Sequence, residues 1–406
     1  MDNDAIVRAR VALLDVYRMS LAQQVAAHRI LAEVSPAVHL PKLSRALARF
    51  SYEAEARNLP EARLLLLDEA VAAAEAMAAD DPRGPETLLD ALDTRQRLLF
   101  EMGRRGDGLV DRSRMAAIER AEPGTRRGFV RGLEAWAAGL AEERRHTEAA
   151  DVYAEAVRAD RADSTDWSRI AWHAQLIAAG RHDEAVAVAA ELVDRARKPS
   201  TPGQERRPHV FHALLHLART LDRAGRDTEA DRVRAEADTL LGGLAADQPS
   251  ESASATDVGL LLSVDTAADE CAAEAGPVPA FGNLLYRWSA DVRQRFEERT
   301  AELGREVDAL PPVTAADPTA ELVALHRRRV VRQAVLEAER RYRFVEHLQP
   351  LFDRGVALAR ALHAHHPGQG AGPLATALTD RALLWTVAGH YAAALADFRQ
   401  AQAVSG

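Results

Sequence analysis

Two stretches of the sequence match each other at a constant separation of 36 residues. A common offset across a helix-length segment, a turn and a second helix-length segment is hard to produce by composition alone. The spacing therefore predicts that one structural unit is repeated along the chain. The matched pairs are Trp136 and Trp172, His146 and His182, and Ala149 and Ala185.

Each repeated unit is expected to be a pair of helices joined by a turn. Leu133, Trp136 and Leu140 recur at spacings of three and four residues, which places them on one face of a helix. In the second helix, Ala149 allows a close approach of the two helices and Tyr153 fills the space beside it. Neither helix can bury its apolar stripe alone, so we expect the units to stack and form an elongated core.

The composition agrees with helices throughout. Alanine, leucine, arginine and glutamate are abundant and are strong helix formers, whereas aromatic residues make up only 5% of the chain. No segment alternates apolar and polar residues for long enough to predict a strand. We therefore predict an all-α fold, an α-solenoid of stacked antiparallel helix hairpins.

The last unit carries the clearest motif. A glycine in the turn is followed by aromatic residues and alanines at helical spacing, namely Gly389, Tyr391, Ala394, Phe398 and Ala401. This pattern resembles the tetratricopeptide repeat, and six candidate units cover somewhat over half the chain. Their period exceeds the 34 residues of the family, so the resemblance is to a divergent, long-repeat type common in large bacterial regulators. It implies a right-handed superhelix whose concave face binds a protein or peptide.

Breaker residues predict the boundaries between parts of the chain. Residues 242–257 are small, polar and acidic, which is typical of a flexible linker. We expect an N-terminal solenoid over 1–241, this linker, a divergent helical segment over 258–316 and C-terminal hairpins over 317–406. Within the middle segment, spaced apolar residues predict one long amphipathic helix over about 281–310.

Several functional classes are disfavoured by the sequence. No run of about 18 uncharged apolar residues is present, and mean hydropathy is −0.25, so we expect no membrane span. The N-terminus carries acids where a signal peptide needs a basic start, and Cys271 is the single cysteine. We therefore expect a cytoplasmic protein, with a formal net charge of −9.

Catalytic and metal-binding signatures are also missing from the sequence. No phosphate-binding loop, nucleophile elbow, zinc-protease helix or paired-cysteine spacing occurs, so we predict a protein that is not an enzyme and needs no cofactor. His212 and His216 stand one helical turn apart and could hold a metal, with His209 nearby. No carboxylate or cysteine completes the set, so we expect no metal.

The resemblance places partner-binding residues on the first helices of successive units, which would line a concave groove. The groove is expected to be charged at its N-terminal end and apolar in the middle, which suits an amphipathic helix or a mostly apolar peptide. Alternatively, Trp167 and Ile170 belong to the core. The candidate groove residues are Asp93, Arg97, Glu134, Ala138, Trp167, Ile170, Ala174, Ile177, His212, Leu215, Arg219, Thr379 and Leu383.

A helix predicted over 322–348 is rich in arginine with interleaved aromatic residues. Arginine with aromatic residues can clamp phosphates and stack on bases, which suggests a regulator that binds nucleic acid or responds to a nucleotide as an alternative function. The chain as a whole is acidic and glutamates share the helix, so a salt-bridged face is the simpler interpretation. The arginines are Arg327, Arg328, Arg329, Arg332, Arg340, Arg341 and Arg343.

The chain end raises the question of what covers the last unit. Solenoids usually close with a helix whose outer face is polar. Here the sequence stops at Gly406, directly after the second helix of the last unit. Either a partner or a second copy covers the remaining apolar seam, giving a homodimer through this end, or the seam is left exposed.

Overall fold

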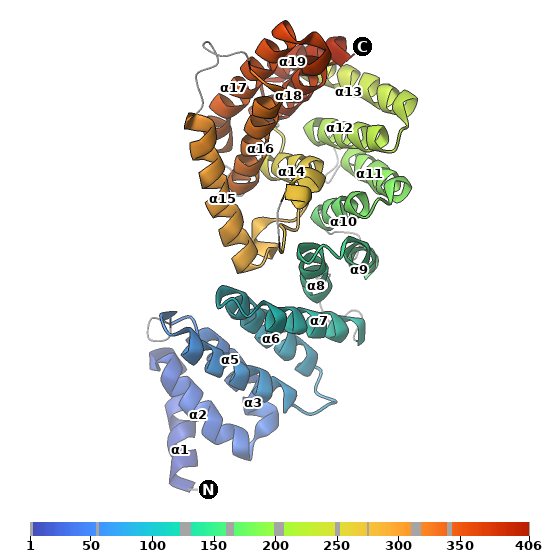
Figure 1. The fold of residues 1–406 in the computed structure, drawn as a ribbon. Helices are drawn as coiled ribbons and strands as arrows, with labels where there is room; N and C mark the ends of the chain where they lie inside the picture. The colour runs from blue at the N-terminus through green and yellow to red at the C-terminus, as the bar shows by residue number, and fades with distance from the viewer. Residues whose placement is uncertain are drawn as a thin grey trace. The chain divides into compact units, whose positions relative to one another are not determined.

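The computed structural model describes residues 3–53, 57–121, 131–159, 166–198, 207–247, 252–273, 276–309, 318–338 and 343–405. Within these residues every regular element is a helix and none is a strand (Figure 1). The predicted all-α fold is therefore confirmed, with helices that pack in neighbouring pairs. The right-handed superhelix remains a prediction.

The chain divides into two compact units. Unit 1 comprises Met1–Gly139, Val152–Ser164 and Ser289–Asp291. Each of its helices packs mainly on the next in the chain, and Leu47, Leu92 and Met115 are fully buried between them. Its helices are α1 (Asn3–Ala12), α2 (Leu21–Val34), α3 (Pro36–Phe50), α5 (Pro60–Glu75), α6 (Gly84–Glu101), α7 (Arg105–Ala121) and most of α8 (Arg131–Glu142).

Unit 2 comprises Leu140–Asp151, Thr165–Trp288 and Val292–Gly406, so the chain does not divide at the predicted boundaries near residues 241 and 317. Its helices begin within α9 (His146–Ala159). They continue with α10 (Trp167–Ala178), α11 (His182–Arg197), α12 (Arg207–Arg223), α13 (Asp227–Asp247), α14 (Ala255–Ala273), α15 (Ala290–Ala309), α16 (Ala320–Glu337), α17 (Phe344–His365), α18 (Pro367–Val387) and α19 (Tyr391–Ser405).

One turn geometry recurs at the hairpins. Gly103, Gly180, Gly225 and Gly389 each follow the first helix of a pair with φ near +70°, a region that favours glycine. The next residue donates its N–H to the carbonyl five positions earlier, as in a Schellman motif. Arg144 takes the equivalent place before α9 with φ 60°, and it lies 36 residues before Gly180. The predicted repeat therefore extends to the backbone of the turn.

The start of the second helix carries a repeated ion pair. An arginine at the turn bonds an acidic side chain three residues later, at 2.6–2.7 Å, and so secures the first turn of that helix. These contacts are exposed, so each stabilises the fold only weakly, but their recurrence identifies the hairpins. The pairs are Arg104 with Asp107, Arg145 with Glu148, Arg181 with Glu184 and Arg226 with Glu229.

The predicted linker over 242–257 is wrong at both ends. Helix α13 continues through Asp247, with Leu244 fully buried, and α14 begins at Ala255. Small residues here serve close packing: a Cβ on Gly259 would lie 2.6 Å from the Cβ of Ala338. The Thr256 hydroxyl donates to the Ala338 carbonyl at 3.0 Å. Helix α14 thus packs against α16, α10 and α18 as part of unit 2.

The predicted helix over 281–310 begins later than expected. Only α15, Ala290–Ala309, is an α-helix, and a short 3-10 turn covers Leu285–Arg287 before it. Gly282 has φ +82° and sits so close to α10 that an added Cβ would lie 2.8 Å from the Cβ of Ala174. This segment is folded against α10 in an irregular conformation because the close approach and positive φ exclude a helix there.

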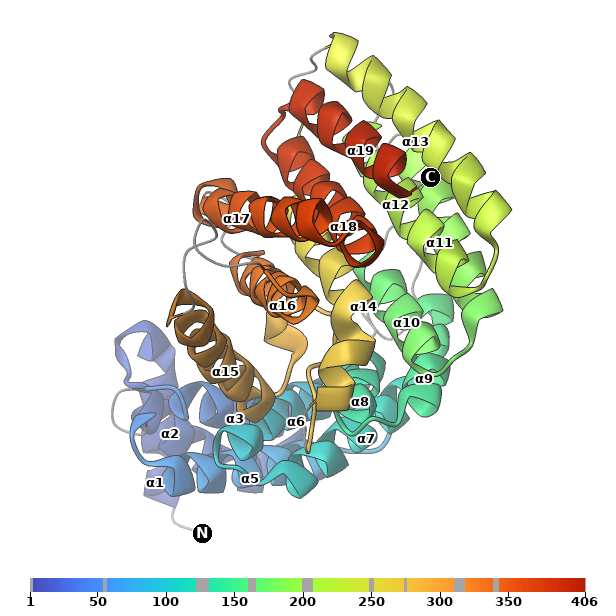
Figure 2. The same cartoon turned by 45° about the horizontal axis from the view of Figure 1, so that its top comes forward.

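The last hairpin of unit 2 packs on an earlier one. Helix α19 lies beside α13 in both views (Figures 1 and 2), and the two helices are in contact. Phe398 of α19 meets Phe211 of α12 edge to face, with 5.6 Å between ring centroids, and both rings are buried. The seam for which we left open a second copy, a partner or exposure to solvent is in contact with α13.

Candidate functional site

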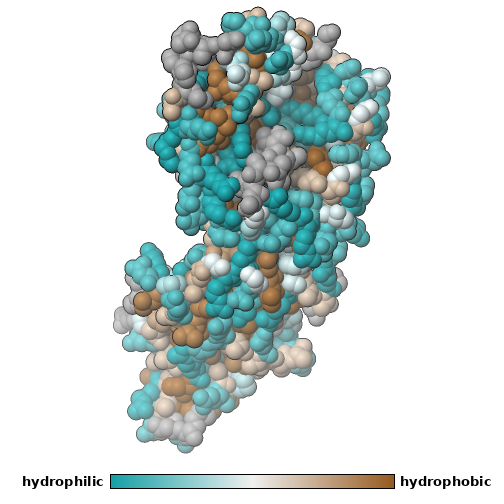
Figure 3. Space-filling model, viewed as in Figure 1, coloured by the Kyte–Doolittle hydropathy of each residue, from teal (hydrophilic) through white to brown (hydrophobic). Residues whose placement is uncertain are grey.

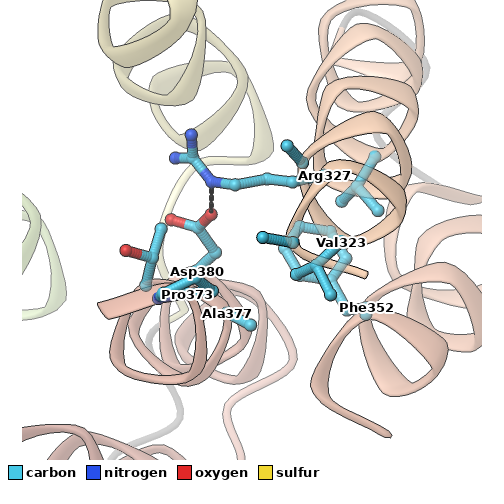
Figure 4. Close-up of a pocket in the computed structure, with 11 residues that line it drawn as sticks. Val323, Arg327, Phe352, Pro373, Ala377 and Asp380 are labelled. Atoms are coloured by element: carbon cyan, nitrogen blue, oxygen red, sulfur yellow. Dashed lines mark hydrogen bonds and ion pairs between the residues drawn. The ribbon is translucent and has the colours of Figure 1, made fainter. Parts of the chain in front are cut away.

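A cavity of about 220 Å³ lies between α16, α17 and α18 in unit 2 (Figure 4). In Figure 4, Val323 and Phe352 lie on one side and Pro373 and Ala377 on the other, with Arg327 reaching across from α16 toward Asp380 of α18. Its walls are mainly apolar. The remaining lining residues are Ala320, Ala324, Val330, Gly355 and Thr376.

The cavity exists because small residues occupy positions where three helices approach each other. Ala320 and Ala324 on α16, Gly355 on α17 and Ala377 on α18 all line it. These small side chains leave unfilled the space between the three helices that larger side chains would occupy. Pockets with apolar walls and a few placed polar groups are the usual form of small-molecule sites.

The polar side of the cavity belongs to a chain of ion pairs. Arg327 Nε donates to Asp380 Oδ2 at 2.8 Å, and Arg219 Nη2 donates to Asp380 Oδ1 at 2.7 Å. Arg219 also bonds Asp265 of α14, which accepts a further bond from Arg223 Nη1 at 3.0 Å. Three guanidinium groups and two carboxylates thereby connect α12, α14, α16 and α18.

Burial and mutual attraction act in opposite directions on these charges. Burial alone would raise the pKa of Asp265, but Arg219 and Arg223 outweigh it and lower that pKa to about 2. Burial likewise opposes the charged form of Arg219, yet Asp265 and Asp380 raise its pKa. Asp265 and Arg219 are therefore both charged at neutral pH.

Neutral histidines form a second buried network beside this cluster. The Thr220 hydroxyl donates to the His216 carbonyl at 2.8 Å, so it accepts from His173 Nε2 at 3.0 Å. His173 Nδ1 is then an acceptor for His216 Nε2, also at 3.0 Å. Burial is the main cause that lowers the pKa of His216 to about 4, and it lowers that of His173 strongly. Two uncharged imidazoles thus link α10 to α12.

His212 points to a different helix from His216. Its Nε2 donates to the Thr386 hydroxyl of α18 at 2.6 Å, because that hydroxyl donates to the Leu383 carbonyl. Burial lowers the pKa of His212 to about 3. The pair that could have held a metal is thereby separated, and the described side chains include no group of three or more potential metal ligands. The side chain of Cys271 lies outside the described residues.

The apolar part of the predicted groove is core. Ile170 and Ala174 are 5% and 1% exposed and pack against Leu260 and Leu261 of α14, with Trp167 and Ile177 at the edge of the same cluster. The prediction of an open groove over α10 is therefore wrong, because α14 and the segment around Leu284 occupy that face.

The remaining groove candidates of unit 2 are also inside the protein. Leu215 and Leu383 are buried in its main core, and Arg219 is held by Asp265 and Asp380. The Thr379 hydroxyl donates to the Ala375 carbonyl within α18. The structure therefore brings these residues together as packing and ion-pair contacts rather than as the lining of a groove.

The candidates in unit 1 form a separate polar cluster. Asp93 is 9% exposed and accepts hydrogen bonds from Gln96, Arg97 and Arg131. Ala138 is fully buried, and Glu134 is partly exposed. Half of the Arg97 side chain is exposed. Through its contact with Arg131, Asp93 links α6 to α8 within unit 1.

The arginine-rich segment is two helices rather than one. Helix α16 ends at Glu337 and α17 begins at Phe344, directly after Arg343, whereas Arg340 and Arg341 lie outside the described residues. Arg329 pairs with Asp308 at 2.6 Å. Arg332 is 3% exposed and lies over the ring of Phe296 at 4.6 Å, and Arg328 is half-buried. Arg327 also pairs with Asp380. Together these contacts favour the interpretation of a salt-bridged face over that of a nucleic-acid site.

Comparisons of the sequence with protein-family models and with curated proteins found no match. None of the helices among the described residues is long and apolar enough to cross a membrane.

Proposed function

We propose that this chain is a non-enzymatic binding protein, a sensor or adaptor, whose unit 2 holds a small, largely apolar ligand. The cavity between α16, α17 and α18 carries this proposal. Because a 150 Å³ apolar cavity in another protein accepts benzene, about 220 Å³ would suit a ligand of roughly nine non-hydrogen atoms. At about −0.5 kcal/mol per atom, such a ligand would bind with a Kd on the order of 0.1 to 1 mM.

The position of the cavity supports a sensing role. Its walls come from three helices, and Arg327 and Asp380 join it to the ion pairs on α12 and α14. An occupant that moves Arg327 or Asp380 would therefore act on contacts between helices far apart in the sequence. Ligand binding would in this way change the stability of the whole unit.

Octanol is a suitable first probe of the cavity. We expect saturating octanol to raise the Tm of the wild-type protein, and Ala377→Phe, which fills the cavity, to reduce the affinity at least about tenfold. Ala393→Phe is the matched control, because Ala393 is exposed on α19 and does not line the cavity. Calorimetric titration of all three proteins measures the effect, and equal affinities would refute the proposed site.

A protein partner for unit 1 is a second candidate function, the one expected from the resemblance. Among the described residues, all the exposed large apolar side chains except Tyr286 belong to unit 1. Leu14 is 85% and Leu65 71% exposed, and Val7 and Val11 share one face of α1. In Figure 3, brown surface is visible over unit 1 in the lower half of the view. A concentration of exposed apolar side chains in one unit favours a binding site for another protein there.

Serine substitutions test this surface. Val11→Ser with Leu65→Ser should abolish crosslinks between the chain and its protein partner, with little change in stability because both side chains are exposed. Ala392→Ser with Ala393→Ser, two exposed positions on α19, should leave the crosslinks intact. Crosslinking followed by mass spectrometry compares the variants, and unchanged crosslinks in the first variant would exclude this surface. The nucleic-acid alternative has less support, since Arg327, Arg329 and Arg332 are engaged within the protein.

A further inference from the structure

We propose that the cavity binds an anionic amphipathic ligand, a monocarboxylate with an apolar body of about eight carbon atoms. This inference rests on the proposed function of the cavity and adds the charge of the ligand. The acceptors of Asp380 and Asp265 are already used, donors remain beside the apolar walls, and the ion-pair cluster has an excess positive charge.

Both carboxylate oxygens of Asp380, which lines the cavity, and of Asp265 behind it are engaged. Asp380 accepts from Arg219 at Oδ1 and from Arg327 at Oδ2, at 2.7 and 2.8 Å. Asp265 accepts from Arg219 at Oδ2 and from Arg223 at Oδ1. A cationic ligand would have to displace a guanidinium group to reach either carboxylate. The site is therefore poorly suited to an amine.

Donors remain beside the apolar walls. Among the described residues, Arg327 uses only its Nε atom, so its two terminal nitrogens are left for another acceptor. Thr376, a lining residue, adds a hydroxyl that can donate to an acceptor in the cavity. The Arg327 side chain is about a quarter exposed, so its head group is reachable from the cavity mouth. Both groups match an incoming carboxylate.

The charge balance points the same way. Three guanidinium groups, from Arg219, Arg223 and Arg327, face only two carboxylates, from Asp265 and Asp380. The cluster therefore carries one excess positive charge, and a ligand that supplies one further negative charge balances it through charge-assisted hydrogen bonds. The apolar chain of the ligand would lie against Val323, Val330 and Phe352.

Three probes of equal length separate this inference from the proposed function. Titration calorimetry with octanoate, octanol and octylamine at about pH 7.5 should give the tightest binding for octanoate, about tenfold weaker binding for octanol, and the weakest for octylammonium. Equal or tighter binding of octanol or octylammonium would overturn the inference while leaving the cavity as a binding site. If none of the three binds, the proposed function itself fails.

Two arginine variants on the same helix provide the matched comparison. Arg327→Gln should remove the preference for octanoate over octanol, because it deletes the unused donors. Arg329→Gln should leave the preference unchanged, since Arg329 pairs with Asp308 and does not line the cavity. A preference that survives in Arg327→Gln would overturn the assignment of the carboxylate to this side chain. The three-probe series on the wild-type protein decides the ligand charge even if a variant fails to fold.

Discussion

Lowering the pH from about 7.5 to about 5 should destabilise unit 2 by roughly 4–6 kcal/mol. The main cause is a set of buried neutral histidines, His173, His212 and His216. Each of these three has its pKa lowered in the folded protein, to about 3 for His212, about 4 for His216 and strongly for His173, with burial as the main cause. Burial also lowers the pKa of His326 in the same unit, which acts in the same direction.

The direction follows from proton binding. An unfolded histidine protonates below about pH 6.5, whereas these three stay neutral in the folded protein well below that pH. Between the folded and unfolded pKa values the unfolded chain binds more protons, so stability falls as the pH decreases through this window. At pH 5 His212 and His216 each account for about 2 kcal/mol, and His173 adds to the loss in the same direction. Asp265 adds nothing in this range, because its pKa is lowered to about 2 and its contribution is lost only in stronger acid.

Urea unfolding followed by tryptophan fluorescence measures the effect. Four of the five tryptophans, Trp167, Trp172, Trp288 and Trp385, belong to unit 2, so the signal reports mainly on it. His212→Leu removes one titrating imidazole, so the loss of stability between pH 7.5 and pH 5 should be smaller by about 2 kcal/mol. The variant should still fold, because the Thr386 hydroxyl keeps its hydrogen bond to the Leu383 carbonyl. His365→Gln, at an exposed position, should leave the loss of stability between the two pH values unchanged. An unfolding midpoint that is flat over this pH range would show that the buried imidazoles are not neutral.

The repeat could be predicted from the sequence because it is local. Turn glycines such as Gly180 and Gly225 adopt the positive φ that the turn requires, and apolar residues at spacings of three and four face the neighbouring helix. The Arg-x-x-Asp/Glu pairs at the start of the second helices have the same local character and are a further sequence signal of the repeat. They extend the repeat to Arg144, where no glycine marks the turn.

The errors share a physical cause: periodicity identifies an apolar face but not what covers it. Ile170 and Ala174 form such a face, and the covering residues, Leu260 and Leu284, lie about a hundred residues later. Glycine and other small residues are equally suited to flexible linkers and to close helix contacts. Gly259, just after the predicted linker, and Gly282, inside the predicted helix over 281–310, belong to the second kind, and their close contacts could not be read from the sequence.

The candidate site was less predictable than the fold. Arg327 was singled out from the sequence, but its partner Asp380 lies 53 residues away and no motif links them. A cavity depends on which alanines and glycines face each other in three dimensions, and Ala324, Gly355 and Ala377 are unremarkable in a sequence rich in both residues. Composition does not distinguish an alanine that packs from an alanine that borders a void.

Replacing Phe398 by alanine should destabilise unit 2 by about 3–5 kcal/mol. Phe398 is 2% exposed and packs edge to face on Phe211, at the place where α19 meets α12 and α13. Loss of the ring removes both the buried area and the aromatic contact, and the helices on either side are too well packed to collapse into the space. Urea unfolding monitored by tryptophan fluorescence gives the change in free energy.

The matched control is a substitution of the next residue, Arg399. Arg399→Ala removes an ion pair between α19 and Asp238 of α13, but the arginine is 59% exposed, so the loss of stability should be much smaller than that of Phe398→Ala. If α13 covers the seam of α19, the unfolding midpoint of the wild-type protein should also be independent of protein concentration. A midpoint that rises with concentration, together with a Phe398→Ala effect below about 1 kcal/mol, would instead mean that a second copy covers the seam.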